Sequence, residues 1–200
     1  MAVEVGVWRG LSATLIAGAM RARGRGGVLF AVDTWLGAVE FWNLRFSGGR
    51  PDRARDLHLV NGYPTVYYTF LSNVVRRQLS EYITPMPMTS RMAAQLLHME
   101  GVKADLIHLD AAHEYNDIKE DIRIWLPLLQ PCGILLGDDY MRDWPGVVRA
   151  ADQLAAIGEF QVVRPKLPNA TQGARANVDG RYGVKWWAQR VGCPRITLPA

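Results

Sequence analysis

Two short, largely apolar runs, residues 106–109 and 134–136, are each followed directly by carboxylates. Asp110 follows the first run, and Asp138 and Asp139 follow the second. Between the runs, apolar side chains recur at helical spacing: Ile118, Ile122, Trp125, Leu126 and Leu129. This pattern predicts a strand, a crossover helix and a second, parallel strand. Because ligands bind at the carboxyl ends of parallel strands, we expect the three acidic side chains at one edge of a sheet.

The chain opens with a pattern typical of a strand, a glycine turn and a helix. An apolar strand begins at residue 3, and Gly6 and Gly10 follow it. The apolar face of the next helix is predicted to comprise Leu11, Leu15, Ile16 and Ala19. Glycine tolerates positive φ and lets a ligand approach the backbone, so the turn favours a nucleotide-like ligand, with a purely structural turn as the alternative. Trp8 stands where a dinucleotide G-x-G-x-x-G would need glycine, and no G-K-[ST] follows.

A second buried strand is predicted over residues 28–32, and Asp33 closes it. An acid at this place, some twenty residues past the glycine turn, is suited to accept hydrogen bonds from ribose hydroxyls. The alternative is a turn or helix-capping aspartate. Taken with the glycine turn, the pattern favours the ribose role.

Strands and helices alternate through the rest of the chain. The predicted elements are a loop over 37–62 as a candidate lid, a helix from Pro64 to about residue 80, a strand over 82–84 ended by 85–89, a helix capped by Ser90 and stopped by Gly101, a helix from Pro145 to near Gly158, a strand over 160–163, a polar segment over 165–180 and a last strand over 182–188. The alternation predicts a three-layer α/β sandwich with a mostly parallel sheet of about seven strands.

Composition and the length of apolar runs add four limits. The 200 residues, 49% of them hydrophobic, predict one compact domain over residues 1–200. Lys and Arg outnumber Asp and Glu by only 23 to 19, and the short basic clusters at 21–25 and 50–55 are interpreted as solvated surface, so nucleic acid is not expected as a partner. Cys132 and Cys193 lack metal-ligand spacing, which favours free thiols. With no membrane-length apolar run and no leader, we expect a soluble, cytoplasmic protein.

The ordered set of motifs resembles class I S-adenosylmethionine-dependent methyltransferases of Rossmann-like fold. It is most similar to the metal-dependent small-molecule O-methyltransferases and the related macrolide-sugar and cephalosporin-type group, from residue 3 to the end. Their first motif, E-x-G-x-x-x-G-x-S, is met by Glu4, Gly6, Gly10 and Ser12. The resemblance implies that the glycines hold the methionine part of the cofactor, that Asp33 binds its ribose and that Ser90 lies beside its adenine. The full implied cofactor-binding set is Glu4, Gly6, Trp8, Gly10, Ser12, Asp33, Ser90 and Asp110.

The family's metal motif maps to Asp110, Asp138 and Asp139, and His113 stands where catechol-type relatives carry a lysine base. Three carboxylates at one edge repel one another unless a cation lies among them, and oxygen ligands favour Mg²⁺ or another divalent cation. We therefore expect Mg²⁺-assisted O-methylation with His113 as general base and Asp110 as a second catalytic residue. Alternatively, the acid pair caps a turn while Tyr140 and Trp144 pack, and His113 caps the next helix. The remaining histidines are interpreted as structural: His58, His98 and His108.

Helices that usually precede the first strand in this family are missing from this sequence. A fragment, a minimal version and a covering partner chain are the alternatives. An exposed cofactor site would favour a homodimer. A methyltransferase-fold scaffold subunit and a nicotinamide oxidoreductase are the rival functions. The aromatic residues Trp35, Trp42, Tyr67 and Tyr68 suggest a small, apolar or ring-bearing hydroxylated acceptor.

Overall fold

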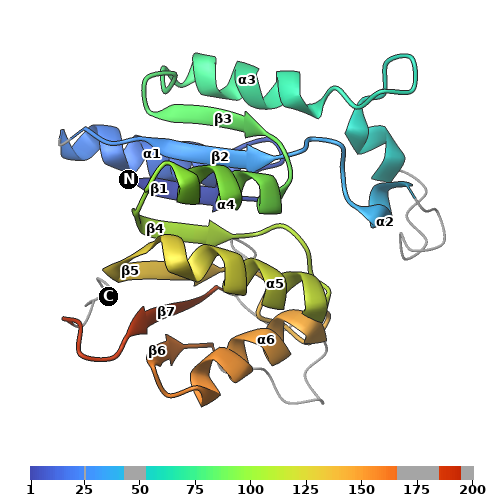
Figure 1. Cartoon of the computed structure of the whole chain (residues 1–200). Coiled ribbons are helices and arrows are strands. Elements are labelled where there is room, and N and C mark those ends of the chain that lie inside the picture. The colour runs from blue at the N-terminus through green and yellow to red at the C-terminus, as the bar shows by residue number, and fades with distance from the viewer. Residues whose placement is uncertain (25, 43–52, 166–184, 195–200) are drawn as a thin grey trace. The chain divides into compact units, whose positions relative to one another are not determined.

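The computed structural model describes residues 1–24, 26–42, 53–165 and 185–194, which form two compact units (Figure 1). The first unit is Met1–Ala93 and the second is Ala94–Ala200. Both units alternate strands with helices, and their seven strands are mostly parallel. The predicted Rossmann-like α/β class is therefore confirmed.

Three parallel strands form the sheet of the first unit in the order β3-β2-β1. Its elements are β1 (Ala2–Val5), α1 (Leu11–Arg23), β2 (Leu29–Asp33), α2 (Val39–Trp42), the 3₁₀ helix η1 (Arg53–Leu57), α3 (Val66–Arg76), β3 (Ile83–Pro87) and the start of α4 (Ser90–Met99). All four residues of β1 are buried, as expected for a strand covered on both faces. In register, Val5 lies opposite Val32, which brings the glycine turn after β1 next to Asp33 at the end of β2.

The buried face of α1 differs from the predicted one. Leu11 is 64% exposed and Leu15 is 50% exposed, whereas Ala13 and Ala17 are fully buried. Ala19 is exposed as well. The two buried alanines stand four residues apart, on one side of the helix, and their small side chains let the helix backbone lie close to its neighbours. The prediction failed because it ranked residues by hydrophobicity and not by size.

Element boundaries shifted in three other places in this unit. β3 continues through Pro85 and Pro87, which an edge strand tolerates because it needs fewer backbone N–H donors. The cap of α4 is Thr89, whose Oγ1 accepts from the Met92 N–H at 3.3 Å, and Ser90 is already helical. α3 ends at Arg76, earlier than predicted. The predicted lid contains α2 and η1, and its residues 43–52 lie outside the described part of the chain.

The second unit contains the predicted strand, helix and strand, but the helix ends at Trp125. Of the predicted helical positions, Leu126 lies in a 3₁₀ helix and Leu129 begins the following strand. Its elements are β4 (Ala104–Leu109), α5 (Tyr115–Trp125), the 3₁₀ helix η2 (Leu126–Leu128), β5 (Leu129–Gly137), α6 (Pro145–Ala156), β6 (Phe160–Val163) and β7 (Trp186–Arg190). β4 and β5 are parallel, and β7 lies antiparallel between β5 and β6. The last strand was predicted over 182–188; residues 166–184 lie outside the described chain.

The two cysteines are joined, so the prediction of free thiols is wrong. A disulfide links Cys132 in β5 to Cys193, just after β7, with 5.5 Å between their Cα atoms. Because β5 and β7 are neighbours, the sheet brings these positions together across 61 residues of sequence. The Gln189 side chain also donates to the Cys132 carbonyl at 3.0 Å. Sequence spacing alone contained no sign of this pairing.

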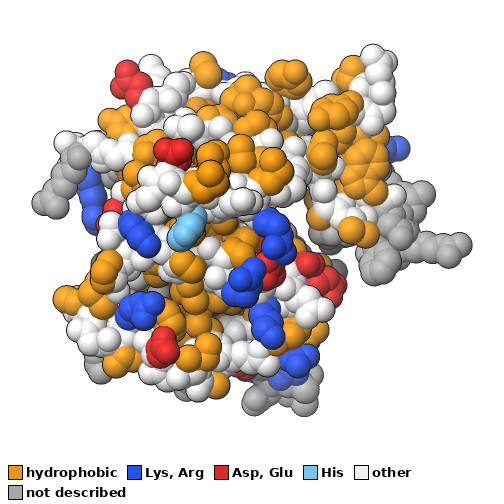
Figure 2. All heavy atoms as spheres, in the orientation of Figure 1, with side chains coloured by type: hydrophobic (Ala, Val, Ile, Leu, Met, Phe, Trp, Pro, Cys, Tyr) orange, Lys and Arg blue, Asp and Glu red, His pale blue; other side chains and the backbone are white. Residues whose placement is uncertain are grey.

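Charged side chains of both signs are mixed on the face seen in Figure 2, where basic side chains over α5 and α6 have acidic neighbours. On α5, for example, Arg123 pairs with Glu120 at 2.7 Å. In the 21–25 cluster, Arg21 donates to the backbone carbonyl of Arg77 at 2.9 Å. These contacts agree with solvated surface. Within the described residues, no helix is long and apolar enough to cross a membrane.

Gly137, the last residue of β5, is predicted to be intolerant of any side chain. It lies opposite Trp186 in register, and a Cβ at this position would lie 2.2 Å from the Trp186 ring, which is 1% exposed. Gly137→Ala should therefore lower the free energy of unfolding in urea by about 1–3 kcal/mol. Gly18→Ala, on α1, is the control. A Cβ at Gly18 would meet no neighbouring atom within 4 Å, and alanine favours a helix, so this substitution should be stabilising. Equal stability of the Gly137 variant and the native chain would contradict this packing.

Candidate functional site

The turn between β1 and α1 is held in place by Asp33. Its Oδ2 accepts from the backbone N–H groups of Val7 at 2.9 Å and Trp8 at 2.8 Å, and its Oδ1 accepts from Trp35 N–H at 2.7 Å. Backbone hydrogen bonds thus occupy much of a carboxylate that was predicted to bind ribose. Asp33 has a clear role in shaping the turn, and its contact with a ribose stays a prediction.

The glycines of the turn have backbone and packing reasons to be glycine. Gly6 has φ 86° and Gly10 has φ 81°, the left-handed region that favours glycine. A Cβ at Gly10 would also lie 2.6 Å from the Phe70 ring. No side chain of the described residues caps the first turn of α1, so its N–H groups are suited to bind the oxygens of a polar ligand.

Aromatic residues surround this turn, and they divide into core and surface. Trp35 was predicted to line a substrate pocket. It is 2% exposed, and its indole N–H donates to the Trp8 carbonyl at 2.7 Å, so it packs in the core instead. Trp8 itself is half-buried, has φ 52° and stacks on Phe41 with 4.6 Å between ring centroids. Trp42 is 51% exposed and Tyr68 is 69% exposed, so both remain available to a ligand.

The other predicted cofactor residues of this unit occupy different environments. Glu4 is fully buried within β1, while Ser12 in the first turn of α1 and Ser90 at the start of α4 are half-buried. Tyr67 is half-buried and its ring packs against Trp35 at 4.7 Å. Their roles toward a cofactor stay predictions.

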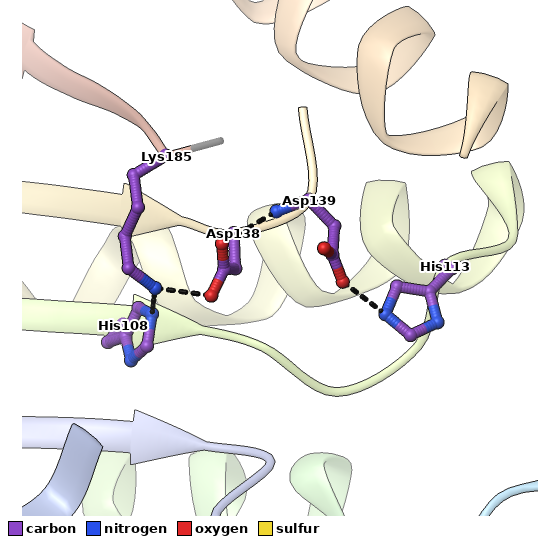
Figure 3. Close-up of polar contacts among 5 residues, drawn as sticks. All are labelled: His108, His113, Asp138, Asp139 and Lys185. Carbon is purple, nitrogen blue, oxygen red and sulfur yellow. Dashed lines mark hydrogen bonds and ion pairs between the residues drawn. The ribbon is translucent and has the colours of Figure 1, made fainter. Parts of the chain in front are cut away.

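In the second unit, the acidic residues follow β4 and β5 as predicted. The Asp138 N–H donates to the Leu109 carbonyl at 3.2 Å, which joins the two strand ends. Asp138 Oδ1 in turn accepts from the Asp139 N–H at 2.9 Å, and Asp139 has φ 57°. This local geometry turns the two neighbouring carboxylates in different directions (Figure 3).

Asp138 faces two residues that sequence reasoning did not connect with it. Lys185 donates to Asp138 Oδ2, and its Nζ lies 3.2 Å from His108 Nε2 (Figure 3). His108 is 1% exposed and its Nε2 lies near the Lys185 ammonium, and its interpretation as structural stays a prediction. The position of polar His108 inside the apolar run of β4 was a signal for it, but nothing in the polar C-terminal sequence identified Lys185.

Asp139 faces His113. The His113 Nε2 lies 2.8 Å from Asp139 Oδ2, and the imidazole stacks on the Trp144 ring with centroids 4.1 Å apart. The N-cap of α5 is Glu114, so the alternative of His113 as the helix cap is wrong. The alternative also predicted that Trp144 merely packs. Trp144 does pack, and its partner is His113, the predicted base. Tyr140 is buried and donates to Asp152 Oδ1 at 2.9 Å.

Two groups of side chains could hold a metal ion, and Asp110 belongs to both. Its ligand atoms lie within 4.8 Å of those of His108 and Asp138 in one group, and of His113 and Asp139 in the other. Burial, followed by the negative charge of Asp138, raises the pKa of Asp110 to about 7, against the lowering effects of His108 and Lys185. The neighbouring cleft of about 20 Å³ accommodates a single water-sized occupant. Carboxylates in excess of cations around such a cleft fit a divalent ion, with nitrogen donors that extend the choice beyond Mg²⁺ to ions such as Mn²⁺.

The raised pKa predicts a pH-dependent effect of Asp110→Asn on stability. The folded-state pKa of about 7 exceeds the ordinary 3.8, so the native Asp110 contributes fully to stability below pH 3.8 and loses this contribution as pH rises to about 7. In a chelating buffer, the asparagine variant should gain stability over the native chain across this window, with a plateau above it. Urea unfolding at several pH values measures the gain. A difference that is independent of pH would contradict the buried, repelled state of Asp110.

Comparison with known proteins identifies the family and the fold. A family described as "Methyltransferase domain" matches residues 3–140. An uncharacterized protein y4gI of Sinorhizobium fredii (strain NBRC 101917 / NGR234) is 28% identical over 137 residues, which are 68% of this chain. The chain spans only 13% of the length of that curated relative.

Solved structures show the same fold. The O-methyltransferase NovP matches 94% of this chain and 71% of its own, with a TM-score of 0.63 and 20% identity. The O-methyltransferase from Bacillus cereus in complex with SAH covers the same shares with a TM-score of 0.62 and 15% identity. TomG from Streptomyces achromogenes, an O-methyltransferase in complex with SAM, covers 96% and 73% with a TM-score of 0.61 and 16% identity. Because the family match extends over more than half of the sequence, the chain belongs to the methyltransferase-domain family.

Proposed function

We propose that this methyltransferase transfers the methyl group of S-adenosylmethionine to a hydroxyl oxygen of a small molecule. Family membership supports methyl transfer over the nicotinamide oxidoreductase alternative. The names of the structural neighbours, which include O-methyltransferases with bound SAM or SAH, favour this cofactor and an oxygen acceptor. The observation that carries the proposal for this chain is the His113–Asp139 pair beside Asp110, because it provides an oriented base in an acidic cleft.

The first unit is proposed to hold the cofactor. The turn at Gly6 and Gly10 brings the backbone near a ligand, and the uncapped first turn of α1 offers N–H groups to its polar atoms. The proposed cofactor contacts in this unit are those of the sequence prediction: Glu4, Gly6, Trp8, Gly10, Ser12, Asp33 and Ser90. S-adenosylmethionine would supply a methyl group on a sulfonium, which an aligned acceptor oxygen would attack in line as the carbon–sulfur bond breaks and S-adenosylhomocysteine leaves.

His113 is proposed to take the proton of the acceptor hydroxyl. Its Nε2 faces Asp139, which fixes the ring orientation, and Trp144 holds the ring plane by stacking. An imidazole has a reference pKa near ~6.5, so it is suited to proton transfer at neutral pH. Asp139 then acts as a positioning residue in addition to any role as a metal ligand.

A divalent cation is proposed to assist the reaction. Asp110, Asp138 and Asp139 would hold Mg²⁺ or a related ion, and His108 offers a further donor. Such an ion would act as a Lewis acid that lowers the pKa of the acceptor hydroxyl and fixes its direction. The acceptor is proposed to be small because a mixed-charge surface, as seen in Figure 2, gives little support for nucleic acid binding. A homodimer stays a prediction.

Methyl transfer from methyl-labelled S-adenosylmethionine to a panel of phenols, sugars and other hydroxylated compounds tests the proposal. We expect label on the oxygen of at least one acceptor, with a higher rate in Mg²⁺ than in EDTA. Label found only on nitrogen or carbon of the acceptors would contradict O-methylation. Equal rates in Mg²⁺ and EDTA would remove the cation from the proposal and leave methyl transfer intact.

A further inference from the structure

Lys185 occupies its position next to Asp138 because of the β5–β7 ladder. Trp186, its neighbour in sequence, lies opposite Gly137 in register and is 1% exposed, and Gly137 directly precedes Asp138. The buried indole therefore places the Lys185 backbone beside the acid pair. The Lys185 side chain is 33% exposed, whereas that of Asp138 is 14% exposed.

The ammonium of Lys185 makes two directed contacts in this position. It donates to Asp138 Oδ2, and its Nζ lies 3.2 Å from His108 Nε2 (Figure 3). These two acceptors belong to the group of possible metal ligands formed with Asp110. A tethered monovalent cation thus occupies two of the residues that a divalent cation would use.

We infer that Lys185 competes with the divalent cation for Asp138 and so sets the cation concentration at which the site fills. The inference rests on the proposed function, because it concerns the cation proposed there. A divalent ion bound by Asp138 and His108 would repel the ammonium at short range, and one His108 nitrogen cannot serve both. Loading of the site therefore requires Lys185 to leave Asp138. Lys185 is a positioning residue here, which acts on the cation through its contact with Asp138.

Titration of Mn²⁺ into the full chain, with free Mn²⁺ followed by electron paramagnetic resonance, tests the competition. Lys185→Met should bind Mn²⁺ about tenfold more tightly than the native chain, because the substitution removes an ammonium that both competes for Asp138 and repels the ion. Lys185→Arg, which keeps the charge, should retain affinity near the native value. Lys103→Met is the matched control, since Lys103 lies outside the cluster and contacts the Pro127 carbonyl, and it should leave affinity unchanged.

A thermal readout and a double variant complete the test. In EDTA, Lys185→Met should lower the melting temperature, because Asp138 loses its counter-ion beside Asp110, and Mn²⁺ should raise the melting temperature of this variant more than that of the native chain. Adding Asp138→Asn to Lys185→Met should abolish the gain in Mn²⁺ affinity. An affinity of Lys185→Met equal to or weaker than the native one, including no Mn²⁺ binding by either chain, would overturn the inference. Methyl transfer measured in parallel reports on the proposed function separately, since activity in EDTA would persist if only the cation site failed.

Discussion

Cys132→Ser is expected to lower the free energy of unfolding by about 4 kcal/mol, because the disulfide closes a long loop in the unfolded chain. The bond spans 61 residues and connects β5 to the segment after β7. Loss of the bond frees the C-terminal end of β7, the strand that begins at Trp186 directly after Lys185. Urea unfolding under non-reducing conditions measures the effect.

The two cysteines supply their own controls, since the chain has no others. Cys193→Ser should cause the same loss, and the double variant should lose no more than either single one, because all three remove the same bond. A reducing agent should lower the stability of the native chain to that of the variants. Losses that add in the double variant would show that the cysteines act separately and would contradict the disulfide.

His113→Ala is expected to slow methyl transfer by about 10²–10⁴-fold, the usual contribution of a positioned general base. Affinity for S-adenosylhomocysteine should stay near the native value, because the His113 ring faces Asp139 and stacks on Trp144, and neither of these residues is a proposed cofactor contact. Single-turnover transfer rates and calorimetric titration measure the two quantities. His98→Ala is the matched control, since His98 is exposed on α4 and should change neither.

Asp33→Asn should give the opposite pattern. An amide at this position presents N–H groups to the backbone donors of Val7, Trp8 or Trp35, so the turn should distort and cofactor affinity should fall.

An unchanged transfer rate in His113→Ala would remove the base from the mechanism. If His113→Ala lost as much cofactor affinity as Asp33→Asn, His113 would be assigned to cofactor binding.

The elements that depend on local patterns were predictable from the sequence. β4, α5 and β5 follow from two apolar runs separated by helical periodicity, and β6 begins and ends at the predicted residues 160–163. The acids that follow β4 and β5 were predictable because parallel strands direct their carboxyl ends to one edge. The pairing of Asp139 with His113 agrees with the predicted involvement of both residues in one site.

Features that depend on contacts distant in sequence were not predictable. The Cys132–Cys193 bond and the Lys185–Asp138 pair both require the antiparallel register of β7 with β5, which no local pattern encodes. The buried face of α1 was misjudged because close packing selected Ala13 and Ala17 over larger apolar residues. Asp33 was identified as important, but its hydrogen bonds to the glycine turn are specified by the β1–β2 register.

Calorimetric titration of S-adenosylhomocysteine into the full chain, with and without Mg²⁺ and beside an NAD control, tests the central claim most directly. The account predicts one binding site per chain in the micromolar range, no requirement for Mg²⁺ and no binding of NAD. It also predicts weaker binding by Asp33→Asn, because the carboxylate holds the turn. No binding of S-adenosylhomocysteine under either condition, by a chain that unfolds cooperatively, would contradict the account.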